Sequence, residues 1–275
     1  MDQVKLIALN DTERPIPLFC FPGAGGSVDI FRQMAQLADK QQAIYGIDIQ
    51  GFLDADRDFS VEQIAELCLP VVRKKQSCGP YFLCGYSFGA LVAYEVAMRL
   101  NSSGETVGVV AMIDTGNPAF ASKLSSAETQ QLGKSYVADR LRKYGHTLIK
   151  GDVKSFVSGL LAVLAARAGV RTRRLVRRIF LAANRPMPAI MRNNDRAMFD
   201  AWRNYVPPIG TLPLLLYCDA HRALQYGGDR TLGWALCTST DIEIESAAAG
   251  HVAMMKGPHI LPFIARLSSL LDRPR

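Results

Sequence analysis

Residues 81–92 read Tyr-Phe-Leu-Cys-Gly-Tyr-Ser-Phe-Gly-Ala-Leu-Val, an apolar strand that runs into Gly85-x-Ser87-x-Gly89 and then into a helix of mostly small residues. This order is typical of a nucleophile elbow, in which the turn is so tight that the serine backbone is strained and both flanking positions lack side chains. The sequence therefore predicts that the Ser87 hydroxyl stands above the end of a sheet. The N–H of Phe88, at the start of the helix, should point to the same place.

The composition is that of a chain with a substantial core. Hydrophobic residues make up 49% of the 275 residues, which suits one large α/β domain or such a domain with an insertion. No signal peptide is evident, and no apolar run approaches the roughly 20 residues that span a bilayer. The net charge of +7 is unevenly placed along the chain. We expect a cytoplasmic protein with no transmembrane segment and no nucleic-acid partner.

The cysteines give no sign of a metal site. The six are scattered, mostly within apolar segments: Cys20, Cys68, Cys78, Cys84, Cys218 and Cys237. No C-x-x-C pair occurs, so neither a zinc site nor a disulfide framework is indicated. We expect buried, reduced thiols.

Apolar runs alternate with helical patterns along most of the chain. Strands are predicted at residues 17–21, 43–48, 81–84, 107–113, 212–218 and 242–246, and helices around residues 31–34, 60–75, 91–100 and 260–271. Ser60 and Gln63 form a capping-box pattern. Residues 242–246 alternate in polarity, as at a sheet edge. This order predicts a mostly parallel α/β sheet.

Residues 117–208 interrupt the alternation. They contain no convincing strand and predict helices at about 125–143, 153–181 and 191–203. We interpret them as a helical lid inserted over the carboxyl ends of the strands, where such sheets bind ligands, with residues 1–116 and 209–275 as the core. The segment from Arg167 to Arg196 holds nine arginines and one acid. A solvated helix face explains that excess as well as a binding surface does.

A serine hydroxyl is a poor nucleophile without a base. The four histidines are His146, His221, His251 and His259. His251 falls in the loop between the last predicted strand and the closing helix, at the same end of the sheet as the elbow. We therefore predict that His251 is the base, whereas His259 packs against or caps the final helix.

The base needs a carboxylate that accepts from the imidazole and fixes its tautomer. Asp114 and Asp219 each end a buried strand on the correct side, and both satisfy the chain order serine, acid, histidine. We favour Asp114. The alternative for Asp219 is a carboxylate that caps the next turn.

The segment Pro22-Gly-Ala-Gly-Gly-Ser27 has two interpretations. A dinucleotide site would use these glycines together with Asp48 at the end of the next strand, but the third glycine of that motif is replaced by Val28. An oxyanion loop would contribute one N–H, from about Ala24, to match that of Phe88. With the elbow present we favour the oxyanion loop.

Together these motifs resemble the thioesterase domains of polyketide and non-ribosomal peptide synthetases. The resemblance rests on Phe-Pro-Gly-Ala-Gly-Gly-Ser at 21–27, Gly-Tyr-Ser-Phe-Gly-Ala at 85–90, Ala-Tyr-Glu-Val-Ala at 93–97, Ile-Asp-Thr at 113–115, Gly-His-x-x-Met at 250–254 and Pro-His-Ile at 258–260. It implies an α/β-hydrolase fold with a helical lid, and Ser87, Asp114 and His251 match the family's catalytic positions. Chain-terminating members place the acid after the sixth strand, here 27 residues past the serine (114 − 87), whereas discrete editing members use the position of Asp219.

The resemblance implies release of an acyl or peptidyl chain from the phosphopantetheine arm of a carrier protein, by hydrolysis or cyclisation, with no metal or other cofactor. The arginine-rich segment, with Arg173, Arg174, Arg177 and Arg178, would then attract an acidic carrier protein. Three alternatives stay open: a discrete editing thioesterase, a lidded carboxylesterase or lipase, and a non-catalytic binding protein with the hydrolase fold. The oligomeric state is not predicted.

Overall fold

The computed structural model describes residues 4–12, 16–38, 42–53, 59–121 and 194–272, with side chains from residue 197 in the last range. They form a seven-stranded sheet in the order β1-β3-β2-β4-β5-β6-β7. The strands are β1 (Lys5–Ala8), β2 (Leu18–Phe21), β3 (Ile44–Asp48), β4 (Tyr81–Tyr86), β5 (Val107–Ile113), β6 (Leu214–Asp219) and β7 (Ile242–Ala247). The six predicted strands are confirmed within a few residues.

Strand directions follow the prediction of a mostly parallel sheet. Strands β2 to β7 pair in parallel, and β7 lies at one edge, as its alternating polarity indicated. At the other edge, β1 pairs antiparallel with β3 and was not predicted. Because the central strands are parallel, their carboxyl ends meet along one side of the sheet, which is where Ser87 and Asp114 lie.

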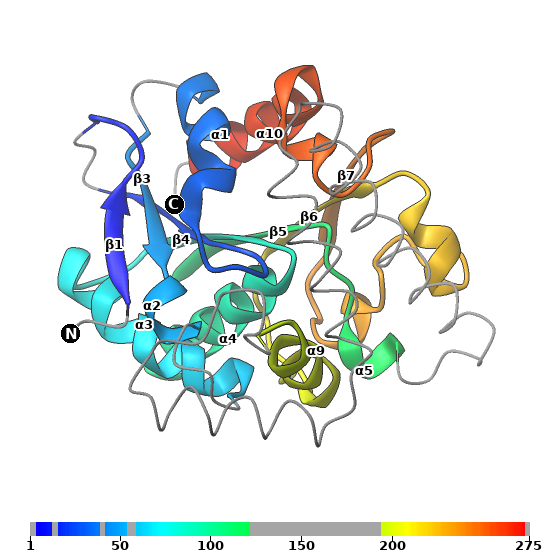
Figure 1. Cartoon of the computed structure of the whole chain (residues 1–275), viewed down its shortest axis with the longest axis horizontal. Helices are drawn as coiled ribbons and strands as arrows, with labels where there is room; N and C mark the ends of the chain where they lie inside the picture. The colour runs from blue at the N-terminus through cyan, green and yellow to red at the C-terminus, as the bar shows by residue number, and fades with distance from the viewer. Residues whose placement is uncertain (1–3, 13–15, 39–41, 54–58, 122–193, 273–275) are drawn as a thin grey trace, which may run out of the picture.

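Helices cover both faces of the sheet (Figure 1). The described helices are α1 (Arg32–Leu37), α2 (Gln50–Leu53), α3 (Val61–Lys75), α4 (Phe88–Ser102), α5 (Pro118–Ala121), α9 (Asn194–Asn204) and α10 (Leu261–Leu271). Helices α1 and α10 pack on one face, and α3, α4 and α9 on the other. The capping box predicted at Ser60 and Gln63 is confirmed at the start of α3.

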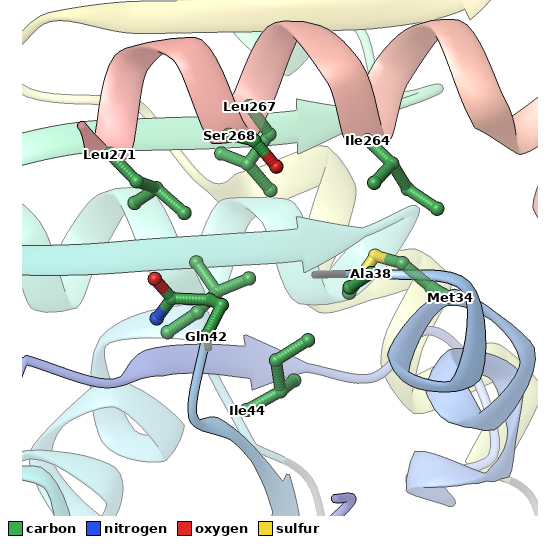
Figure 2. A pocket seen from close by; sticks show the side chains of 9 residues that line it. Met34, Ala38, Gln42, Ile44, Ile264, Leu267, Ser268 and Leu271 are labelled. Carbon is green, nitrogen blue, oxygen red and sulfur yellow. The ribbon is translucent and has the colours of Figure 1, made fainter. Parts of the chain in front are cut away.

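Two hydrophobic clusters result from the alternation of side chains along the strands. In β2, Phe19 and Phe21 face the α3 and α4 side, whereas Leu18 and Cys20 face α1 and α10. On this second face a small cavity lies between α1 and α10, lined by aliphatic side chains together with Gln42 and Ser268 (Figure 2). Its lining belongs to the core, away from the carboxyl ends of the strands.

The predicted lid lies mostly outside the described residues. Helices α5 and α9 fall within 117–208, and α9 matches the helix predicted at 191–203. The helices predicted at 125–143 and 153–181, His146 and the arginines 173, 174, 177 and 178 lie outside the described ranges. The boundaries of the lid therefore stay a prediction.

The thiols are free, as expected, and five of the six are buried. Cys78 is the exception, because it lies in the exposed turn after α3. No helix in the described ranges has the length and apolar character needed to cross a membrane.

Candidate active site

The nucleophile elbow is formed as predicted where β4 meets α4. Ser87 lies between them with φ 53° and ψ −124°, a backbone conformation that L-residues rarely adopt. Its N–H donates to the carbonyl of Ile113 at 2.8 Å, which ties the turn to the end of β5. The side chain is half-buried at the carboxyl end of the sheet. This strained turn is what holds the hydroxyl above the sheet.

Both glycines of the elbow are required by close backbone contacts. A Cβ on Gly85 would lie 2.3 Å from Cα of Ala90, and one on Gly89 would lie 2.2 Å from the carbonyl oxygen of Phe21. The contact of Gly89 brings the start of α4 against the end of β2, where the loop with Ala24 begins. The elbow and that loop are therefore neighbours.

His251 lies between β7 and a 3₁₀ turn, η5 (Ala253–Met255). Its Nδ1 is 2.5 Å from Oδ2 of Asp114, although the two residues are 137 positions apart. Because an ionised carboxylate only accepts hydrogen bonds, Nδ1 carries the proton and Nε2 is left as the basic nitrogen. The structure thus pairs the predicted base with the predicted acid.

Asp114 is buried at the end of β5, with a side chain 1% exposed. Like Ser87 it has a positive φ, 48°, and its N–H donates to the carbonyl of Tyr217 at 2.7 Å. Burial alone would raise the pKa of this carboxyl. The Arg222 guanidinium, 3.4 Å away, and His251 outweigh burial and hold the pKa below its usual 3.8. Asp114 is therefore ionised and suited to stabilise an imidazolium.

Asp219 ends the next strand but has other partners. Its carboxylate accepts from the His221 N–H at 2.9 Å and lies 3.3 Å from the His221 Nδ1. Its own N–H points at Oδ1 of Asp114, at 3.4 Å. Asp219 thus caps the following turn, the alternative interpretation of this residue.

The Ser87 hydroxyl and His251 are not joined by a hydrogen bond in the part of the chain that the structure describes. Such bonds are often long without substrate and tighten when it binds. The link between the two segments is instead Tyr86, whose ring stacks on the imidazole with centroids 4.8 Å apart.

The glycine-rich loop after β2 forms a tight turn. The N–H of Gly26 donates to the carbonyl of Gly23 at 3.0 Å, which places Ala24 at the exposed corner. The N–H of Phe88 is among the first of α4, which have no acceptor within their own helix. Two backbone donors are thus available near the elbow. Asp48, the acid of the dinucleotide interpretation, instead accepts from the N–H of Gln50 at 3.1 Å.

Two residues of the site were missed at the sequence level, Arg222 and Tyr86. Arg222 opens the 3₁₀ turn η3 (Arg222–Tyr226) after β6, and Tyr86 precedes the serine. The tyrosine lies inside the elbow motif, so its place next to Ser87 was a usable signal; no pattern marks the arginine. His259 is exposed just before α10, and only its backbone carbonyl makes a contact, accepting from the Tyr217 hydroxyl, so the predicted packing of this histidine is not seen. Across the described ranges, no group of three or more His, Cys, Asp and Glu residues is placed to hold a metal ion.

Comparison with known proteins agrees with this geometry. Residues 16–267 match the family model described as "Thioesterase domain". Among curated proteins, 112 residues are 41% identical to the polyketide synthase PksR of Bacillus subtilis, and 115 residues are 32% identical to the indigoidine synthase of Dickeya dadantii. These alignments cover 40% and 42% of this chain but only 4% and 8% of those proteins.

Solved structures share the fold over nearly the whole chain. The NocB thioesterase domain from the nocardicin cluster is 17% identical, with a TM-score of 0.63 and coverage of 98% of this chain and 99% of that one. The type II thioesterase BorB from the borrelidin cluster is also 17% identical, with a TM-score of 0.61 and 97% of each chain covered. These similarities show an α/β-hydrolase fold of the thioesterase kind.

Proposed function

The chain belongs to the thioesterase domain family, and from that premise we propose that it releases an acyl or peptidyl chain from the phosphopantetheine arm of a carrier protein, with Ser87 as the nucleophile. One observation carries the proposal: a serine with positive φ follows β4 at the end of the sheet where buried Asp114 is joined to His251 at 2.5 Å. A strained serine, a base and an orienting acid are the parts of a serine hydrolase.

The first half of the reaction forms an acyl-enzyme. The Nε2 of His251 takes the proton of Ser87 as its Oγ attacks the thioester carbonyl carbon. Asp114 stabilises the imidazolium through Nδ1. The carbon–sulfur bond then breaks, and the leaving thiolate receives the proton from His251. An ester on Ser87 remains.

The second half removes the chain. His251 takes a proton from water, or from a hydroxyl or amine of the chain, as that group attacks the ester carbonyl carbon. The bond from this carbon to Oγ of Ser87 then breaks, and His251 returns the proton to Oγ. In both halves the N–H groups of Phe88 and Ala24 hold the negative oxygen, at about 3–4 kcal/mol per donor. The chemistry uses side chains, backbone donors and water, with the substrate carried on the partner's arm.

We assign the chain to the chain-terminating type rather than the discrete editing type. The short distance from His251 to Asp114 and the capping bonds of Asp219 to His221 support this assignment. The relatives named above are synthases of which this chain spans a small part, which supports a carrier protein as partner.

The test is mass spectrometry of the intact protein after incubation with an acylated carrier protein. We expect an acyl adduct on Ser87 that is absent from Ser87→Ala. Thioester cleavage by Ser87→Ala within a few-fold of wild type would contradict the assignment. The mass of the adduct would also report the size of the chain.

Two controls separate the remaining alternatives. A lidded carboxylesterase would turn over simple oxoesters as well as carrier-bound thioesters, whereas the proposed enzyme prefers the latter. A binding protein with a hydrolase shell would not be labelled at Ser87 by a fluorophosphonate, whose phosphorus bonds Oγ as fluoride leaves.

A further inference from the structure

Tyr86 contacts His251 in two separate ways. Its ring stacks on the imidazole, with centroids 4.8 Å apart and planes 25° from parallel. Its hydroxyl donates to the carbonyl of the same residue at 2.9 Å. One side chain therefore holds both the ring and the backbone of His251, from a position next to Ser87 in the chain.

The same ring also lies against the loop that carries Ala24. A Cβ added to Gly23 would be 2.9 Å from Cδ1 of Tyr86 and 3.2 Å from its carbonyl oxygen. The glycine thus lets the loop approach the ring closely. Three segments of the site meet at this tyrosine: the elbow, the oxyanion loop and the histidine loop.

Asp114 holds the imidazole at one edge, through Nδ1. That bond alone restrains rotation of the ring about its Cβ–Cγ bond less than it does together with a second contact on the ring face. The histidine loop is short and ends in the 3₁₀ turn η5, with 23% of the His251 side chain exposed. The flat contact with Tyr86, which is 7% exposed, restricts that rotation.

We propose that Tyr86 is a positioning residue: its stacked ring and its hydroxyl hold His251 in the orientation in which Nε2 faces Ser87. The inference rests on the proposed function, in which His251 is the base. Reaction rates depend steeply on such alignment, and a misplacement of about 1 Å costs about 100-fold.

Two substitutions separate the two contacts. Tyr86→Phe keeps the stacked ring and removes only the hydrogen bond to the His251 carbonyl. Tyr86→Leu removes both while keeping an apolar side chain in the core. We expect kcat to fall by about 2–10-fold in Tyr86→Phe, the worth of one hydrogen bond, and by about 100-fold in Tyr86→Leu. The KM for the carrier-bound substrate should change little, because the tyrosine is buried beneath the site.

The chain supplies a matched control at Tyr81. This tyrosine is also buried, begins the same strand at the end away from the site, and donates its hydroxyl to a backbone carbonyl, that of Gln76, at 2.9 Å. Tyr81→Phe should lower thermal stability as much as Tyr86→Phe does and leave kcat unchanged. An equal loss of kcat in both variants would show that the tyrosines act only through packing.

A readout independent of activity follows from the stacking. A ring 4.8 Å from the imidazole shifts the His251 ring protons upfield in the NMR spectrum, and Tyr86→Leu should move those resonances downfield. His251→Gln identifies them, and the resonances of His221 should stay in place. Unchanged His251 resonances in Tyr86→Leu would overturn the proposal.

Failure of this inference is distinguishable from failure of the proposed function. Full activity of Ser87→Ala or His251→Ala would contradict the proposed function. If those variants are inactive and a folded Tyr86→Leu keeps the kcat of wild type, only the positioning role is wrong. Should Tyr86→Leu fail to fold, the comparison of Tyr86→Phe with Tyr81→Phe decides between the two roles.

Discussion

The guanidinium of Arg222 lies 3.4 Å from Oδ2 of Asp114, the oxygen that also bonds His251. Arg222 is 23% exposed and reaches the carboxylate from the turn after β6, so the acid is placed between a permanent cation and the base. These two groups are the charged side chains that offset burial and keep the pKa of Asp114 low. The ionised form of the acid therefore depends on a residue outside the three proposed catalytic positions.

Arg222→Met should make the enzyme sensitive to acid. Without the cation, burial raises the pKa of Asp114, so the carboxyl takes up its proton at a higher pH. As pH falls, the variant should lose kcat/KM before wild type does, and the two should be most alike at neutral or alkaline pH. A pH–rate profile measures this. Arg266→Gln is the matched control, because Arg266 pairs with Glu243 at 2.6 Å, away from the site. Superimposable acidic limbs for Arg222→Met and wild type would contradict the role.

Substitution of the two candidate acids, Asp114 and Asp219, should lower kcat to very different extents. Asp114→Asn keeps the shape of the side chain but leaves His251 in the wrong tautomer, and we expect kcat to fall by about 10⁴-fold. Asp219→Asn should stay within a few-fold of wild type, since its carboxylate caps the turn at His221. Steady-state turnover of a carrier-bound thioester is the measurement. An inactive Asp219→Asn beside an active Asp114→Asn would place the chain with the discrete editing type.

Gly89→Ala should destabilise the protein strongly. The added methyl would lie 2.2 Å from the carbonyl oxygen of Phe21 and 2.3 Å from that of Pro22, and backbone atoms cannot move aside cheaply. We expect a loss of about 3 kcal/mol or more in the free energy of unfolding, measured by denaturant titration. Gly250→Ala is the control, because nothing lies within 4 Å of its added Cβ. Equal stability of the two variants would mean that the elbow tolerates a side chain.

The sheet and the elbow were predictable because their signals are local. An apolar run such as 107–113 marks a buried strand, and Gly85 and Gly89 mark a turn with no room for a Cβ. Strand β1 gave no such signal, since it has four residues and none of them is buried. Its place in the sheet comes from pairing with β3.

The contacts that refine the site were not predictable, because they join residues far apart in the chain. Tyr86 and His251 are separated by 165 positions, and Arg222 and Asp114 by 108. The place of Tyr86 beside Ser87 indicates that it lies near the site but not that it contacts His251, and no local pattern marks Arg222. Only the packing of the sheet brings these partners together.

The arginine-rich segment supports a last prediction, made from sequence because residues 167–193 lie outside the described ranges. The sequence from Arg167 to Arg196 contains nine arginines and one acidic residue, whereas the whole chain has a net charge of +7. A cationic surface speeds encounter with an acidic carrier protein more than it tightens the complex. Replacing Arg173, Arg174, Arg177 and Arg178 with glutamine should therefore lower kcat/KM for carrier-bound substrate by about tenfold at low salt, with little change for a small thioester mimic. The loss should shrink as salt rises, because screening removes the same advantage from wild type. Equal losses on both substrates, or a loss that salt does not alter, would mean that these arginines stabilise the fold instead.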